Sequence, residues 1–135
     1  MSFVYPAGKL LMARQALDST ALRALLVMTD STAYAETGTT TLSGFTHLDE
    51  YSGGGYERKL LKVAFSEETM GFESAEVVWH SLREGPRRAM AMIAFQQGRT
   101  DADSIPIGFI DSGFPFYGNG GPVRVSWPSG LLQIK

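Results

Sequence analysis

Two histidines, His47 and His80, are the only imidazoles of the 135-residue chain, which contains no cysteine. The missing cysteine excludes a disulfide framework, a thiolate zinc site and a cysteine nucleophile. His80 precedes Ser81, so a nucleophile and its base could be neighbours, but adjacent strand residues point to opposite faces. No serine lies in a Gly-x-Ser-x-Gly elbow either. We therefore interpret His80 as a surface or half-buried strand residue and His47 as a polar loop residue.

Carboxylates are the other candidates for catalysis or metal binding: Asp101, Asp103, Asp111, Glu67 and Glu68. The spacing of Asp101 and Asp103 could hold calcium, but the glycine and glutamate of an EF-hand loop do not follow. Aspartate also favours turns, because its side chain bonds to nearby backbone amides. We predict turn chemistry for this pair, and the sequence indicates no catalytic, metal or cofactor-binding residues.

Glycine clusters at 53–55 and 118–121 could cradle a phosphate only if a helix followed each of them. Neither cluster is followed by Lys-Ser/Thr or by a helical pattern. We interpret both as turns that need positive φ angles. Residues 83–88 hold three arginines and one glutamate, the only local basic cluster. A solvated turn explains this cluster, and a contact with an acidic patch on a partner is the alternative.

Aromatic side chains gather in two places, near the start of the chain and in a late glycine-rich loop. Aromatic loop residues are enriched in protein interfaces, but they also plug the ends of β-sandwiches. Both interpretations remain open from the residues alone. The candidate contact residues are Phe3, Tyr5, Phe114, Phe116 and Tyr117.

Length and composition describe one globular domain, residues 1–135, with a mass of 14.7 kDa. The net charge is −2, so no basic excess favours nucleic-acid binding. No apolar run is long enough to span a membrane, and the first residues do not resemble a secretory signal. We therefore expect neither a nucleic-acid nor a membrane partner.

The alternation of apolar residues and turn signals predicts an all-β domain of about seven or eight short strands, a sandwich or a barrel. Segment 89–97 is apolar on both faces, which is typical of a central strand covered on both sides. Segment 22–28 fits a helix or a buried strand equally well. Residues 29–55 form one long loop, which usually indicates a function or disorder. The other predicted strands are 9–14, 56–65, 72–82, 105–111, 123–127 and 131–134.

The last third of the chain carries an ordered series of motifs. It includes Ile-Gly-Phe-Ile-Asp at 107–111, Gly-Phe-Pro-Phe at 113–116 and Gly-Asn-Gly-Gly at 118–121. The series, with Val-Val-Trp at 77–79 ahead of it, resembles a family of small tailed-bacteriophage virion proteins. These are capsid cement, decoration or head-fibre-like proteins. The resemblance covers roughly residues 9–135, and Val78 stands where the family has threonine or a similar polar residue.

The resemblance implies a jelly-roll-like β-sandwich without enzymatic activity, and it favours a strand at 22–28. It also implies a structural virion protein that binds the outside of the phage head and stabilises contacts between subunits of the major capsid protein. Such a protein is made in the host cytoplasm, and we expect a homo-oligomer, a dimer or trimer. Residues 1–8 are a candidate N-terminal arm, and removing residues 1–7 should release the protein from heads and leave it folded.

A second hypothesis is a virion-associated, carbohydrate-binding β-sandwich used for host adhesion. Tyr51, Tyr117 and Trp127 could stack on sugar rings, while Asp or Asn side chains bond to hydroxyl groups. Sugar-dependent binding would distinguish this hypothesis from a purely structural role.

Overall fold

The computed structural model of the chain describes residues 2–14, 20–66, 71–74, 76–111, 113–125 and 132–133. Its largest element is an antiparallel sheet of five strands in the order β1-β8-β7-β2-β3. This order places β1 beside β8 and β2 beside β7, although each pair is far apart in the sequence. The strands are β1 (Phe3–Val4), β2 (Leu22–Met28), β3 (Lys59–Leu60), β7 (Ala89–Gln96) and β8 (Ile105–Ile110).

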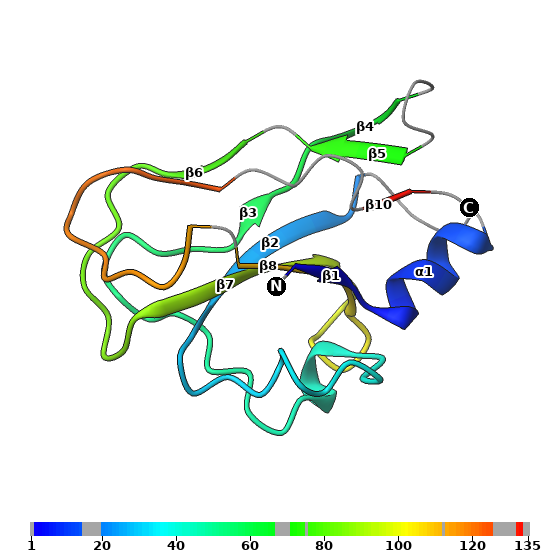
Figure 1. Cartoon of the computed structure of the whole chain (residues 1–135), viewed down its shortest axis with the longest axis horizontal. Helices are drawn as coiled ribbons and strands as arrows, with labels where there is room; N and C mark the ends of the chain where they lie inside the picture. Colours follow the sequence, from blue (N-terminus) through cyan, green and yellow to red (C-terminus); the bar gives the residue numbers. More distant parts are fainter. Residues whose placement is uncertain are drawn as a thin grey trace.

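Two smaller antiparallel sheets form a second layer on one side of the large sheet (Figure 1). The first has the order β10-β5-β4, and in the second β6 pairs with β9. The expected all-β, sandwich-like fold is confirmed. The strands are β4 (Val63–Ser66), β5 (Gly71–Ser74), β6 (Val77–Trp79), β9 (Val123–Val125) and β10 (Leu132–Gln133).

The centre of the large sheet is the antiparallel pair β2 and β7, which runs from Leu22 opposite Gln96 to Met28 opposite Ala89. Arg23 is the only half-exposed residue of β2, and the other six are buried. The predicted central strand at 89–97 is therefore confirmed. Segment 22–28 is a strand, because its apolar residues on both faces are covered by the layers above and below.

The core between the layers is centred on Trp79, which is completely buried on β6. Its indole Nε1 donates a 2.7 Å hydrogen bond to the carbonyl of Glu57, so its polar atom is satisfied. From the large sheet, Leu26, Met92 and Ile110 belong to the same buried cluster.

The opposite face of the large sheet is covered by the long segment that follows β2, cyan in Figure 1. This segment contains the 3-10 helix η1 (Leu42–Gly44), and Leu42 is buried in the second core cluster. The amide of Leu42 bonds to the carbonyl of Ser104 at 2.9 Å, and that of Tyr51 to the carbonyl of Leu26 at 2.8 Å. The long loop predicted at 29–55 is thus a packed cover, which explains its length.

The predicted strand at 9–14 is wrong, because Pro6–Ala13 form the helix α1. Proline suits the first turn of a helix, since it has no N–H to leave unbonded, and the following Lys-Leu-Leu-Met-Ala run favours helix. The helix packs closely on β8. A Cβ atom at Gly8 would lie 2.8 Å from Cα of Ile107, so glycine permits this approach.

Two predicted strands are each divided between sheets. Segment 56–65 provides β3, which pairs with β2, and then β4, which pairs with β5. Leu61 lies at the crossing point, where it is buried and its amide bonds to Leu22 O at 3.0 Å. Segment 72–82 similarly provides β5 and β6, which pair with different partners. Hydrophobic alternation continues through both crossings, so the sequence pattern does not show them.

The candidate N-terminal arm is part of the fold rather than an extension from it. Phe3 pairs with Phe109, and Val4 with Gly108, so β1 forms an edge of the large sheet. Tyr5 has no exposed surface, and its hydroxyl donates a 2.9 Å hydrogen bond to Ala33 O in the covering segment. Removing residues 1–7 would delete these contacts, so the expectation of a folded truncated chain does not hold for this structure.

Within the described residues, no helix has the length and apolar character that crossing a membrane requires.

Tyr5→Ala is expected to lower the free energy of unfolding by about 3–5 kcal/mol, because it removes a buried ring and leaves a cavity. The matched control is Tyr34→Ala, since 51% of Tyr34 is exposed. Its expected effect is within about 0.5 kcal/mol. Urea unfolding followed by circular dichroism measures both variants. Equal losses would contradict the role of Tyr5 in joining β1 to the covering segment.

Candidate functional site

The two histidines do not form a catalytic pair with a described residue. His80 is exposed in the turn directly after β6, not in a strand as predicted, whereas its neighbour Trp79 is buried at the end of β6. His47 is exposed in the covering segment, and its Nε2 lies 3.9 Å from Oδ1 of Asp49. No group of three or more His, Asp or Glu side chains among the described residues could hold a metal ion. Glu67 and Glu68 lie outside the described residues.

Asp49 fastens the covering segment to the turn before β7. Its carboxylate accepts hydrogen bonds from Arg87, including Nε at 3.0 Å, and from the amide of Asp30 at 3.0 Å. The side chain is only 2% exposed, and the backbone has a positive φ of 53°. Burial alone would raise the pKa of Asp49, but the hydrogen bonds from Arg87 and Asp30 hold it below its usual value. This carboxylate is therefore structural.

Arg58 fastens the end of the covering segment in the same way. Its guanidinium bonds to Glu50 at 2.8 and 2.9 Å and to Asp101 at 2.9 and 3.1 Å. It also lies 5.2 Å from the ring centre of Phe95, a cation–π distance. The hydrogen bond from Arg58 lowers the pKa of Asp101. The carboxylate of Asp103 accepts a 2.7 Å hydrogen bond from the amide of Thr100 within a turn. Asp101 and Asp103, two of the carboxylate candidates, therefore have structural roles.

The free energy of unfolding should decrease at acidic pH, because protonation of Asp49 removes its stabilising contribution. Because its pKa is lowered by folding, its contribution is complete above the ordinary aspartate value of about 3.9 and is lost as the pH falls through the folded value. Asp49→Asn removes this titration and keeps a residue type that tolerates positive φ. We expect a flatter loss of unfolding free energy between about pH 5 and 2 than in the unmodified chain. The exposed carboxylate variant Glu76→Gln should keep the steep loss, and an unchanged profile in Asp49→Asn would contradict this role.

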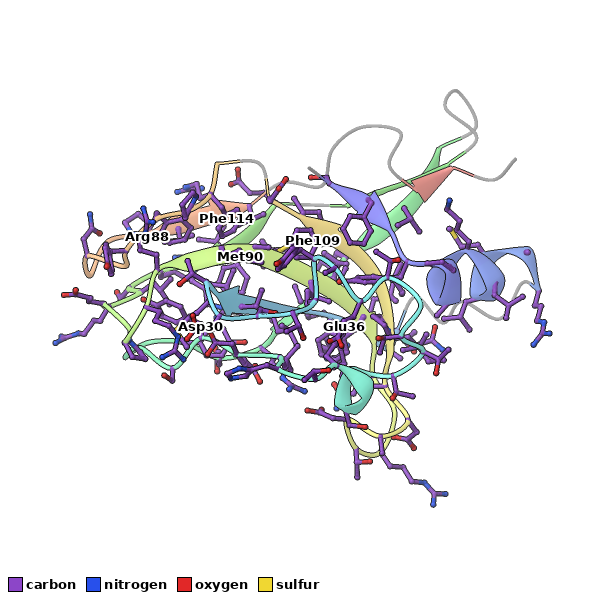
Figure 2. The ribbon with its side chains drawn as sticks, turned by 60° about the horizontal axis from the view of Figure 1, so that its bottom comes forward. Asp30, Glu36, Arg88, Met90, Phe109 and Phe114 are labelled. Atoms are coloured by element: carbon purple, nitrogen blue, oxygen red, sulfur yellow. The ribbon has the colours of Figure 1, made fainter. Side chains whose placement is uncertain are left out.

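An open apolar groove of about 390 Å³ lies on the covered side of the large sheet. Figure 2 shows Met90 of β7 and Phe109 of β8 next to each other at this place. Tyr34, from the covering segment, is half exposed there and makes no described hydrogen bond through its hydroxyl. The groove is lined by Thr29, Tyr34, Met90, Phe109 and Asp111.

Two of the segments predicted to make contacts meet beside this groove, at Asp111. The hydroxyl of Ser2 donates to the Asp111 carboxylate at 3.3 Å and accepts its amide at 3.2 Å. The amide of Phe114 bonds to the Asp111 carbonyl at 3.1 Å. Phe3 stacks on Phe109, with ring centres 5.1 Å apart. The N-terminal segment and the 113–117 loop therefore belong to one surface.

The five predicted contact residues have different positions. Phe3 and Phe114 are half-buried, Phe3 against the core cluster under the covering segment and Phe114 against the cluster between the layers. Tyr5 is in the core and cannot make an external contact in this fold. Phe116 is half-buried, and its backbone pairs with Ala89 through bonds of 2.8 and 3.0 Å. Tyr117 is 55% exposed. Of these five, none lines the groove itself, and Phe3 reaches it only through its stacking on Phe109.

Tyr34 and Met90 were missed by the sequence interpretation. Tyr34 is the one aromatic residue in the Thr- and Ser-rich first half of the long loop. Its isolation among polar residues could have identified it as a candidate contact residue. Met90 sits within a strand predicted to be covered on both faces, so nothing in the sequence distinguished it from the core.

The basic cluster at 83–88 divides into bonded and exposed arginines. Arg87 is held by Asp49 and lies 3.3 Å from Asp30. Arg88 is exposed, and its guanidinium has no hydrogen bond or ion pair within the described part of the chain.

The chain matches no protein-family model, no curated protein and no solved structure. The functional interpretation therefore depends on the residues and on the geometry described above.

Proposed function

We propose that the protein is a structural component of a phage virion, a capsid cement or decoration protein. Its partner would be the major capsid protein, and it would bind the outside of the head after synthesis in the host cytoplasm. The ordered motifs of the last third of the chain support this proposal through their resemblance to that family.

The observation that carries the proposal is the groove at Asp111. Its floor is formed by the half-buried Met90 and the buried Phe109, which belong to the two adjacent strands β7 and β8. A surface on paired strands keeps its shape, so binding does not have to order it first. An apolar centre with aromatic side chains and a polar rim is the usual anatomy of a stable protein contact.

The physical role follows from binding to the assembled shell only. A molecule that contacts two neighbouring capsid subunits favours the assembled state by mass action. Many copies on one shell add their contributions, and a dimer or trimer would engage several sites at once. Such a role requires a rigid core and a contact surface but no reacting groups. The use of Asp49 and Asp101 as structural anchors fits this requirement.

Copy number in purified virions tests the proposal. Quantitative mass spectrometry should find hundreds of copies per particle if the protein covers the head. A few copies would instead indicate the tail or a single vertex. Absence from purified virions would contradict a structural role in the particle.

Substitution in the groove tests the contact surface. Tyr34→Ala combined with Met90→Lys should weaken binding to heads that lack the protein at least tenfold, because it removes apolar contact and places a charge on the floor. The control is Leu10→Ala on α1, where 49% of the side chain is exposed. Sedimentation of heads with the bound protein measures occupancy, and urea unfolding checks the fold of each variant. Equal occupancy of both variants would exclude the groove as the contact.

A further inference from the structure

A second hollow, of about 510 Å³, opens where the loop before β7 meets the loop before β9. It shares no lining residue with the groove, and its lining differs in chemistry because every residue is polar or glycine. Its walls are Ser81, Arg83, Glu84, Gly118, Asn119 and Gly120.

The loops around this hollow are held by a continuous set of backbone hydrogen bonds. The amide of Gly120 bonds to Leu82 O at 2.8 Å, and the amide of Leu82 bonds to Gly121 O at 3.2 Å. The amide of Arg83 bonds to Gly54 O at 2.8 Å. Because three separate loops hold each other, the hollow keeps its shape without a ligand, which lowers the entropy lost on binding.

Tyr51 supports the hollow from behind. Its ring is 2% exposed, and its hydroxyl donates a hydrogen bond to Arg83 O. A Cβ atom at Gly118 would lie 2.4 Å from Arg83 O and 2.6 Å from the Tyr51 hydroxyl, so only glycine allows the two loops to approach this closely. The buried position of Tyr51 means that it cannot stack on a sugar, as the adhesion hypothesis suggested, and Trp127 lies outside the described residues.

The polar side chains of the hollow are available to a ligand. Arg83 and Glu84 are exposed, and neither side chain has a hydrogen bond or ion pair with another described residue. Asn119 uses its Oδ1 to accept the amide of Gly121 at 3.0 Å, which fixes the side chain and leaves its NH₂ donors without a described partner. The hollow thus offers a guanidinium fork, a carboxylate and an oriented amide within one small region.

This set of groups fits a neutral, polyhydroxylated ligand. Adjacent charges of opposite sign disfavour a strongly anionic or cationic ligand, and the lack of apolar lining disfavours a hydrophobic one. Hydroxyl groups of a sugar both donate and accept, so they can bond to Arg83, Glu84 and Asn119 together. Tyr117 precedes Gly118 in the chain and is 55% exposed, so an aromatic ring for stacking belongs to the same loop.

We propose that the hollow lined by Arg83, Glu84 and Asn119 binds a saccharide. The site is independent of the head-binding groove, so the protein could hold the shell with one surface and contact a glycan with the other.

A glycan array probed with the labelled full-length chain tests the proposal, followed by titration of the best neutral glycan. We expect saturable binding that the double variant Arg83→Met, Glu84→Met weakens at least tenfold. The matched control is Arg99→Met, because Arg99 is also an exposed loop arginine without a described side-chain partner, but lies outside the hollow. It should bind as the unmodified chain does. Urea unfolding of each variant separates lost binding from lost fold.

Two results would overturn the proposal: no glycan bound above the level of the heat-denatured chain, or binding that the double variant leaves unchanged. Binding lost in Tyr34→Ala, Met90→Lys instead would assign the saccharide to the groove and also overturn it. Head occupancy of the Arg83→Met, Glu84→Met variant tests whether glycan binding and head binding are independent. This variant should lose glycan binding but still occupy heads fully.

Discussion

The pairing of β2 with β7 places two apolar strands side by side with almost no exposed surface on either face. Apolar surface of this extent is stable only if both faces are kept from water. The layer of small sheets covers one face, with Trp79 at its centre. The other face is covered by an irregular segment, and several ion pairs and side-chain hydrogen bonds among the described residues hold that segment in place.

An irregular cover lacks the regular hydrogen-bond ladder of a sheet, so its attachment depends on individual contacts. Asp49 with Arg87 fixes one place, and Arg58 between Glu50 and Asp101 fixes another. Tyr5 joins β1 to the cover through Ala33. Acidic residues such as Asp49 and Asp101 are used in this way. The apolar groove and the polar hollow are the surfaces where we propose contacts with partners.

Much of the fold follows from local sequence patterns. The two-faced apolar run at 89–97 predicts a central strand, and the glycine clusters predict turns with positive φ, which Gly55 and Gly120 adopt. The division of 56–65 and 72–82 between sheets could not be predicted, because alternation is the same on either side of a crossing. Helix α1 was missed because Gly8 disfavours helix locally, while its close packing on Ile107 is a tertiary contact that no local pattern contains.

The candidate sites were only partly predictable for a related reason. Phe3 and Phe114 were identified as contact residues from their type, but only the β1–β8 pairing brings the N-terminal segment to Asp111, beside the loop that carries Phe114. Arg83 and Glu84 stood out as charges in a turn, whereas the hollow between them and Asn119 exists only once distant glycine loops approach. Residue type indicated which side chains could bind, and the long-range pairing determined which of them share a surface.

The order of strands also affects how the chain can fold as it is synthesised. β2 ends at Met28, but its main partner β7 is complete only when Gln96 has been synthesised. β1 can pair with β8 only after Ile105–Ile110 have been synthesised. A nascent chain therefore exposes the apolar run of β2 until most of the domain has left the ribosome. Non-local pairing of this kind slows folding and lengthens exposure to aggregation. The chain should depend on chaperones during synthesis more than its small size would suggest.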